Sequence, residues 1–197
     1  MPMEKPFSQA CENNKGPILE VLKKHFRPCS HILEIGSGTG QHGVHFAPAL
    51  PHLIWQCSDM PGNHAGINAW IDEAPAHNLK RPVAFTIGQH PWPKGDFDGV
   101  FSANTAHIMQ PQEARLMMEL VAHNLPKGGI FCQYGPFNID GRYTSDSNRS
   151  FDESLRNQGY GGIRDIGELQ DWAVSKLQLV ERLAMPANNF TLVWRKV

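Results

Sequence analysis

Short apolar runs alternate with amphipathic stretches along most of the chain. The runs HILEI, LIWQCS, VAFTI, DGVFSA and GGIFCQYG are typical of buried strands, whereas the apolar residues between them recur at helical spacing. We expect strands at 31–35, 53–58, 83–87, 98–103 and 128–135, and helices at 17–26, 40–49, 63–78 and 111–125. Strands that alternate with helices predict an α/β fold with a mostly parallel sheet and helices on both faces.

The last third of the chain departs from this alternation. Residues 137–164 are polar and contain glycines, with one short helix expected at 150–157. A connection of this length is more often a functional lid than a plain loop. A helix at 168–177 and strands at 178–186 and 189–197 complete the pattern, and the tight sequence PANN between these strands predicts an antiparallel hairpin. We therefore expect a single domain over residues 1–197, with a seven-stranded sheet and a lid-like insertion.

The overall charge and the cysteines narrow the classes of partner. The chain has 18 basic and 19 acidic side chains, so no large field of one sign favours a nucleic acid or an anionic membrane, and a small-molecule partner is expected. Its 4 cysteines are scattered, which argues against a disulfide framework and favours a reducing, cytoplasmic setting. The first residues lack the apolar core of a leader, and no apolar run approaches the roughly 20 residues of a membrane span, so a soluble protein is expected. These features leave the oligomeric state open.

The stretch HILEIGSGTGQHG places glycines directly behind the first apolar run. Read from Gly38 it is G-x-G-x-x-G, the dinucleotide fingerprint, and read with Glu34 it is E-x-G-x-G-x-G. In a dinucleotide fold the first glycine forms the tight turn after the strand, and that position is Gly36 here. Counted from Gly36, the third fingerprint position would be Gln41, which is too bulky for close helix packing. The pattern therefore favours the register of Glu34, Gly36, Gly38 and Gly40.

Two acids accompany the glycines. Glu34 lies inside the first strand, where burial of a carboxyl group requires a partner such as a cationic ligand. Asp59 ends the second strand, 19 positions after Gly40, where an acid can accept both hydroxyls of a ribose. Asp59 thus indicates a ribose without selecting the cofactor, and capping of the next helix is its alternative role.

This combination resembles motif I of class I S-adenosylmethionine-dependent methyltransferases, in which the glycines let the backbone approach the cofactor. Many such enzymes carry an acid at the end of the third strand, where this chain has Thr86. Ile87 could then flank the adenine ring and Gln89 reach its amine, unless Gln89 is simply exposed. The resemblance implies that S-adenosylmethionine is bound by Glu34, Gly36, Ser37, Gly38, Thr39, Gly40, Asp59, Met60, Ile87, Gln89 and Asn104.

Several later segments narrow the resemblance. NTAHI, YGPFNIDGRYTSDSNRSFDESLR, GIRD and MPANN together resemble the methyltransferase-like protein 26 family over essentially the whole chain. This implies a Rossmann-like methyltransferase fold and S-adenosylmethionine as the cofactor, and it names no acceptor. Two other function classes stay open. One is a non-catalytic S-adenosylmethionine-binding protein that acts through a protein partner, and the other is an NAD-dependent oxidoreductase that uses the G-x-G-x-x-G register.

Polar residues at the ends of strands 98–103 and 128–135 are candidates for the chemistry. A neutral nucleophile benefits from a base, and histidine has a suitable intrinsic pKa, so His107 is the first candidate and Tyr134 the second. The alternative for His107 is a buried structural histidine. We expect a small-molecule acceptor to enter between Asn104, His107, Tyr134 and the lid-like insertion, which should also cover the cofactor.

Other polar residues have simpler interpretations. Three arginines in the insertion could hold a carboxylate or phosphate of the acceptor, although a solvated face is the commoner role. They are Arg149, Arg156 and Arg164. Asn188 and Asn189 are typical of a hairpin turn. His42 and His45 lie at i, i+3 spacing, but the sequence places no third ligand with them, so no metal site is expected.

Overall fold

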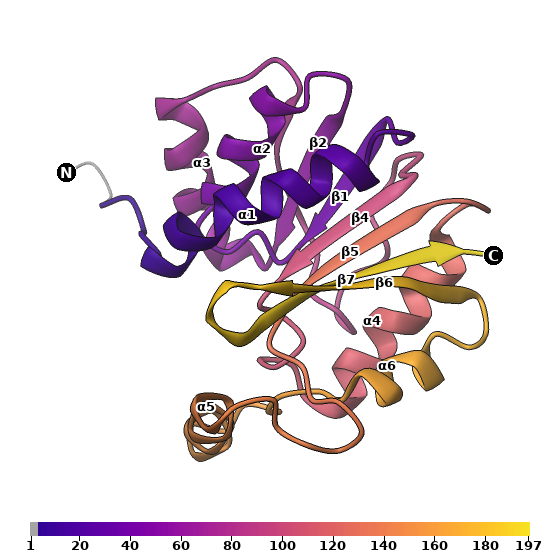
Figure 1. Ribbon diagram of the computed structural model, residues 1–197. Helices are drawn as coiled ribbons and strands as arrows, with labels where there is room; N and C mark the ends of the chain where they lie inside the picture. The colour runs from indigo at the N-terminus through magenta and orange to yellow at the C-terminus, as the bar shows by residue number, and fades with distance from the viewer. Residues whose placement is uncertain (1–3) are drawn as a thin grey trace. The chain divides into compact units, whose positions relative to one another are not determined.

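The computed structural model describes residues 4–197, so the first three residues of the stretch examined for a leader lie outside it. Over the described residues, seven strands form one sheet of order β3-β2-β1-β4-β5-β7-β6 (Figure 1). The strands are β1 His31–Ile35, β2 Ile54–Asp59, β3 Leu79–Ala84, β4 Gly99–Ala103, β5 Ile130–Gly135, β6 Leu177–Met185 and β7 Asn189–Lys196. β1 pairs in parallel with β2 and β4, and β2 with β3, whereas β7 is antiparallel to β5 and β6. The predicted α/β fold with an antiparallel terminal hairpin is confirmed.

The helices connect these strands. They are α1 Gln9–His25, α2 Gln41–Ala49, α3 His64–Glu73, α4 Pro111–Asn124, α5 Asp146–Asn157 and α6 Ile166–Trp172, with short 3-10 turns η1 Pro61–Asn63 and η2 Pro186–Asn188. The chain divides into two compact units, Met1–Ser102 and Ala103–Val197, which we call the amino-terminal and carboxy-terminal units.

In the amino-terminal unit, aromatic side chains hold α2 against the sheet. The ring of Phe46 on α2 lies 5.5 Å from the rings of both Trp55 on β2 and Phe101 on β4, measured between centroids. All three side chains are fully buried. α1 packs on α2, and α3 packs on β3 (Figure 1). Residues 36–40 connect β1 to α2, and we call them the glycine loop. Because α2 starts where this loop ends, the packing of α2 fixes one end of the loop.

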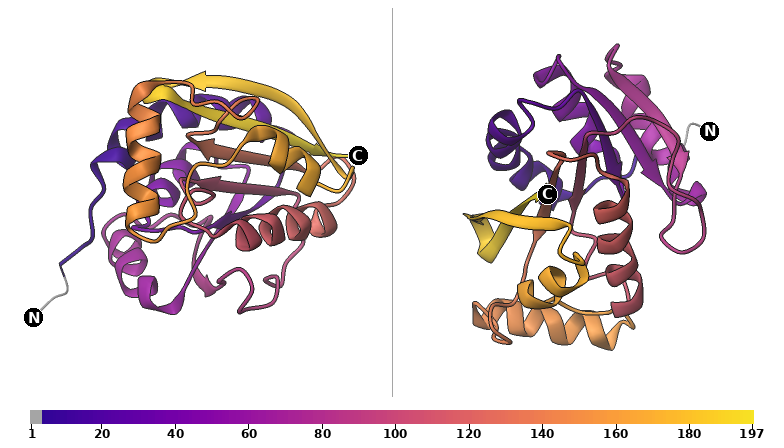
Figure 2. Two further views of the ribbon diagram at one scale, coloured as in Figure 1. Left: turned by 90° about the horizontal axis from the view of Figure 1, so that it is seen from below. Right: turned by 90° about the vertical axis from the view of Figure 1, so that its right-hand side faces the viewer.

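In the carboxy-terminal unit, α6 packs against α4 and β6. The helix α5 lies beside the turn of the β6–β7 hairpin, as both views of Figure 2 show, and the Asn148 side-chain amide donates to the carbonyl of Asn188 (3.1 Å). In that turn Ala187 and Asn188 have φ of 60° and 58°. Asparagine adopts this left-handed conformation more readily than most residues, so the predicted turn role of Asn188 is confirmed.

Several predicted boundaries were wrong for identifiable reasons. α1 begins at Gln9, not at Pro17, because the Ser8 hydroxyl accepts the Cys11 N–H (3.2 Å) and starts the helix within a polar stretch. β3 lies at 79–84 instead of 83–87, with Pro82 inside it. Proline is tolerated there because β3 is an edge strand.

The remaining helix boundaries also differ from the pattern. α3 ends at Glu73, before the break expected near Pro75, and α5 begins at Asp146 where the Ser145 hydroxyl accepts the Asn148 N–H (3.0 Å). α6 ends at Trp172, five residues short of the predicted end at 177. The helices were thus expected in the right places, and their ends differ by a few residues.

The structure also bears on membrane-spanning helices and on disulfides. No helix within residues 4–197 is long and apolar enough to cross a membrane. No disulfide joins the 4 cysteines, of which Cys29, Cys57 and Cys132 are buried.

Candidate functional site

The loop between β1 and α2 depends on glycine at three alternate positions. Gly36, Gly38 and Gly40 have φ of 71°, 60° and 94°, a left-handed conformation that strains other residues. A Cβ at Gly40 would also lie 3.0 Å from the Cα of Ile67, whereas a Cβ at Gly38 would meet nothing within 4 Å. Gly40 is therefore needed for packing as well as conformation, and Gly38 leaves open space above an exposed backbone.

Beneath the loop, Glu34 and Ser37 belong to a buried network. The Ser37 hydroxyl and the Trp55 indole N–H donate to the same Glu34 carboxylate oxygen, at 2.8 and 3.2 Å. The Ser58 N–H donates to the Ser37 hydroxyl (3.0 Å). Burial raises the pKa of Glu34 to about 7. The carboxyl group of Glu34 thus accepts hydrogen bonds from neutral donors, and it supports the loop through its bond with Ser37.

Asp59 at the end of β2 is joined directly to the glycine loop. One carboxylate oxygen accepts the N–H of Gly38 (2.7 Å) and the other accepts the N–H of Met60 (2.7 Å). Each carboxylate oxygen has a second lone pair, so the group can still accept two hydroxyls. Asp59 is partly exposed, as a ligand-binding role requires.

The segment after β3 forms a turn. The Thr86 N–H donates to the His90 ring (2.9 Å), and the Gln89 N–H donates to the Thr86 carbonyl (3.0 Å). Ile87 is buried, and Gln89 and Met60 are exposed. Because β3 ends at Ala84, Thr86 lies in this turn and not at the strand end, where the sequence pattern had predicted it.

In the carboxy-terminal unit, Asn104 follows β4 in a left-handed conformation, with φ of 56°. Its N–H donates to the carbonyl of Tyr134 at the end of β5 (2.9 Å). Asparagine adopts this conformation more readily than most residues. The structure thus brings two predicted residues, Asn104 and Tyr134, to neighbouring backbone positions.

His107 is 5 % exposed, and burial lowers its pKa to about 4. Its ring lies edge-on to Phe151 of α5, with centroids 5.4 Å apart. The His107 carbonyl accepts the N–H of Gly162 (3.0 Å). The imidazole is therefore neutral at physiological pH, which a base requires, and the 137–164 segment holds its backbone.

A buried carboxylate organises the 137–164 segment. Asp152 on α5 accepts the Ile163 N–H (2.8 Å), the Arg156 guanidinium N–H (3.1 Å) and the Tyr143 hydroxyl. Although burial acts to raise the pKa of Asp152, the hydrogen bonds from Tyr143, Ile163 and Arg156 outweigh it and the pKa is lowered. Sequence reasoning missed Asp152, because an acid in a polar helix reads as a solvated residue.

The arginines of this segment differ from one another. Arg149 and Arg156 are exposed, and the Arg149 guanidinium lies 5.5 Å from the centre of the Tyr143 ring. The solvated face expected for most of the three thus holds for these two. Arg164 is buried and donates to the carbonyls of Gly161 (2.8 Å) and Gly162 (3.2 Å). Its main contacts are thus with the backbone of its own loop.

The histidine pair of α2 packs into the unit. The Nε2 of His42 lies 2.7 Å from the Asn14 side-chain oxygen, and its ring stacks on Phe46. Burial lowers the pKa of His42 to about 4. Within residues 4–197 the structure contains no group of three or more histidine, cysteine, aspartate or glutamate residues placed to hold a metal ion.

The arrangement of the sheet is shared with solved methyltransferases. An S-adenosylmethionine-dependent methyltransferase, SibL, in its apo form has a TM-score of 0.77 and 19% identity over 95% of this chain and 55% of its own. Human N-acetylserotonin methyltransferase in complex with S-adenosylmethionine has a TM-score of 0.81 and 13% identity over 95% and 53%. An O-methyltransferase family 2 protein from Planctomyces limnophilus DSM 3776 in complex with apigenin has a TM-score of 0.75 and 16% identity over 85% and 51%.

These likenesses define the class of fold, which is that of the Rossmann-like methyltransferases. The chain spans about half the length of these three neighbours. Residues 5–196 also match a family model described as "Protein of unknown function (DUF938)". The chain belongs to the DUF938 family.

Proposed function

We propose that this protein is an S-adenosylmethionine-dependent methyltransferase that acts on a small-molecule acceptor. The observation that carries the proposal is the Asp59 carboxylate bonded to the N–H of Gly38, since it combines a ribose acceptor with the glycine loop in one rigid feature. The fold of the solved neighbours supports it, and the narrower resemblance to the methyltransferase-like protein 26 family agrees with it.

The residues of the amino-terminal unit fit this cofactor. The open space above Gly38 allows a ligand to approach the backbone, and Asp59 retains lone pairs for two ribose hydroxyls. Counted from Gly36, the turn directly after β1, the third position of a dinucleotide fingerprint is Gln41, and its side chain is 2 % exposed, which disfavours an NAD register that begins at this turn. Met60, Ile87 and the turn at Gln89 are the proposed contacts of the adenosine part.

The acceptor chemistry is assigned to the carboxy-terminal unit. When bound, the sulfonium of S-adenosylmethionine supplies an electrophilic methyl group. The neutral imidazole of His107 would take the proton of an acceptor hydroxyl, thiol or amine as that group becomes the nucleophile. A pKa of about 4 makes His107 a weak base, so acceptors that lose a proton easily are favoured. Tyr134 and Asn104 are proposed to orient the acceptor.

A labelling experiment tests the proposal. The purified protein is incubated with S-adenosylmethionine carrying a radiolabelled methyl group and a fractionated cell extract, and the label is followed by molecular size. Label is expected in a low-molecular-weight product that separates from S-adenosylmethionine and does not form when the protein is left out. Label chiefly in RNA or protein fractions would contradict a small-molecule acceptor, and tight binding without transfer would instead favour a non-catalytic binding protein.

We further propose a reducing setting and no nucleic-acid partner. Cysteines that form no disulfide suit a reducing compartment such as the cytoplasm. The nearly balanced charge offers no basic stripe for a nucleic acid.

A further inference from the structure

Residues 5–15, which we call the amino-terminal strap, lie against both α3 and the start of α2. The Trp70 indole N–H of α3 donates to the carbonyl of Pro6 (2.6 Å). A Cβ at Gly66 would come within 2.7 Å of the Pro6 ring, so α3 has a glycine where the strap crosses it. The Lys5 ammonium lies 3.6 Å from the centre of the Trp70 ring and pairs with Glu73. The strap is thus firmly attached at one end.

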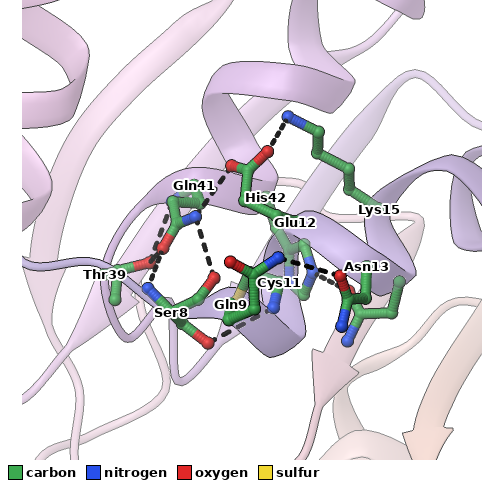
Figure 3. Close-up of polar contacts among 10 residues, drawn as sticks. Ser8, Gln9, Cys11, Glu12, Asn13, Lys15, Thr39, Gln41 and His42 are labelled. Carbon is green, nitrogen blue, oxygen red and sulfur yellow. Dashed lines mark hydrogen bonds and ion pairs between the residues drawn. The ribbon is translucent and has the colours of Figure 1, made fainter.

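At its other end the strap is joined to the glycine loop through Gln41 (Figure 3). The side-chain oxygen of Gln41 accepts the Ser8 N–H (2.7 Å) and the Thr39 hydroxyl (2.9 Å). Its side-chain nitrogen donates to the Ser8 carbonyl (3.1 Å) and to the Glu12 carboxylate (2.9 Å). One side chain therefore connects two strap residues to a residue of the loop.

These four contacts use the full capacity of the amide. A glutamine side chain has two N–H donors and one oxygen with two lone pairs, and each is engaged within the protein. The residue is 2 % exposed. Gln41 has no polar atom left for a ligand, so its effect on a cofactor must pass through the loop.

We propose that Gln41 is a positioning residue that holds the glycine loop in its cofactor-binding conformation by bonding it to the amino-terminal strap. The loop needs such support because glycines at three alternate positions leave its backbone free to adopt many conformations. This inference rests on the proposed function for the identity of the ligand. It explains why a bulky side chain occupies the position at which a dinucleotide loop has glycine.

The negative charge of Glu12 requires a hydrogen-bond donor at position 41, which the amide of Gln41 supplies. Hydrogen bonds from Lys15 and Gln41 hold the pKa of Glu12 below its usual value, so a carboxylate faces position 41. The substitution Gln41→Glu keeps the size of the side chain but sets two carboxylates against each other and removes both donors. Combining Gln41→Glu with Glu12→Gln returns a donor to this contact from the opposite side.

The experiment measures hydrogen exchange at residues 36–40 in the cofactor-free protein and S-adenosylmethionine affinity by calorimetry. Gln41→Glu should speed exchange in the loop and weaken binding by about tenfold, because both donors of the side chain are lost and two carboxylates then face each other. The double variant should recover part of both losses. Gln9→Ala is the matched control, because Gln9 bonds only Asn13 among the contacts of the strap drawn in Figure 3 and lies on the exposed side of α1.

Unchanged loop exchange together with unchanged affinity in folded Gln41→Glu would overturn the proposal. If that variant does not fold, Thr39→Val removes the hydroxyl that donates to the Gln41 side chain and also accepts the Gln41 N–H (3.2 Å). Exchange at residues 36–40 must then rise, and unchanged exchange there overturns the proposal equally. The wild-type protein could bind no S-adenosylmethionine while exchange in the loop still rises in Gln41→Glu. That result would refute the proposed function, but it would support the inference that the strap stabilises the loop through Gln41.

Discussion

The two units each contain a carboxyl group that is 1 % exposed, and the pKa values of these groups are shifted in opposite directions. In the amino-terminal unit, burial raises the pKa of Glu34 to about 7, because its bonded donors, the Ser37 hydroxyl and the Trp55 indole, are neutral. In the carboxy-terminal unit, Asp152 is equally shielded from solvent, yet its pKa is lowered.

The difference has two causes: Glu34 lies deeper in the protein, so burial raises its pKa more, and Asp152 has more donors, one of which is charged. Asp152 accepts hydrogen bonds from Tyr143, from the backbone of Ile163 and from the Arg156 guanidinium, and together these outweigh the effect of burial. Burial alone therefore does not decide whether a carboxyl group is charged. The comparison predicts that the support of the glycine loop weakens as pH rises, whereas the support of the 137–164 segment weakens as pH falls.

The largest expected effect comes from Glu34. Between about pH 4.5 and 7 the folded protein keeps a proton that the unfolded chain releases, so the free energy of unfolding falls as pH rises, by about 3 kcal/mol in total. Glu34→Gln has no proton to lose and should remove this slope. The measurement is urea unfolding of both proteins at a series of pH values, with the exposed Glu20→Gln as control. Parallel curves for wild type and Glu34→Gln would mean that Glu34 ionises normally.

The second prediction tests whether the two units have different functions, by substitution of His107. His107→Gln should lower the methyl-transfer rate by roughly 10² and leave S-adenosylmethionine affinity unchanged, because we assign chemistry to the carboxy-terminal unit and cofactor binding to the amino-terminal unit. In the wild type, the rate should show no loss from protonation of His107 until the pH nears 4. Transfer assays with His123→Gln, exposed on α4, supply the control. A full rate in folded His107→Gln would return His107 to a structural role.

The smallest effect sharpens the contrast at Asp152. Asp152→Asn keeps an oxygen for the Ile163 N–H but turns an amide toward Tyr143 and Arg156, which should cost about 1–2 kcal/mol of stability. Most of this belongs to the buried contacts, because Arg156 is itself 56% exposed and its ion pair is screened. Exchange at residues 161–163 should rise in the variant, and in the wild type it should rise as pH falls through the lowered pKa of Asp152. Glu153→Gln, exposed on the same helix, should change neither; an equal rise in both variants would remove Asp152 as the cause.

The fold was largely predictable because apolar runs mark buried strands, and the register of Gly36, Gly38 and Gly40 identified the loop. The position of β3 was not predictable. Its proline is tolerated only because β3 lies at the edge of the sheet, and a local pattern does not reveal the order of the strands. The roles of Gln41 and Asp152 depend on partners far along the chain, such as Ser8 for Gln41. Hydrophobic periodicity has no signal for such contacts, and a polar residue in a polar stretch reads as solvated.

The central claim is that Asp59 and the glycine loop bind S-adenosylmethionine, and calorimetric titration tests it most directly. Wild-type protein is titrated with S-adenosylmethionine and, separately, with NAD, and the first titration is repeated with Asp59→Ala. We predict that the wild-type protein binds S-adenosylmethionine and not NAD. Binding of S-adenosylmethionine should be weaker in Asp59→Ala by about 1–3 kcal/mol, because charged hydrogen bonds to the ribose are lost. Binding of NAD in preference to S-adenosylmethionine, or an unchanged affinity in the folded Asp59→Ala variant, would contradict the claim.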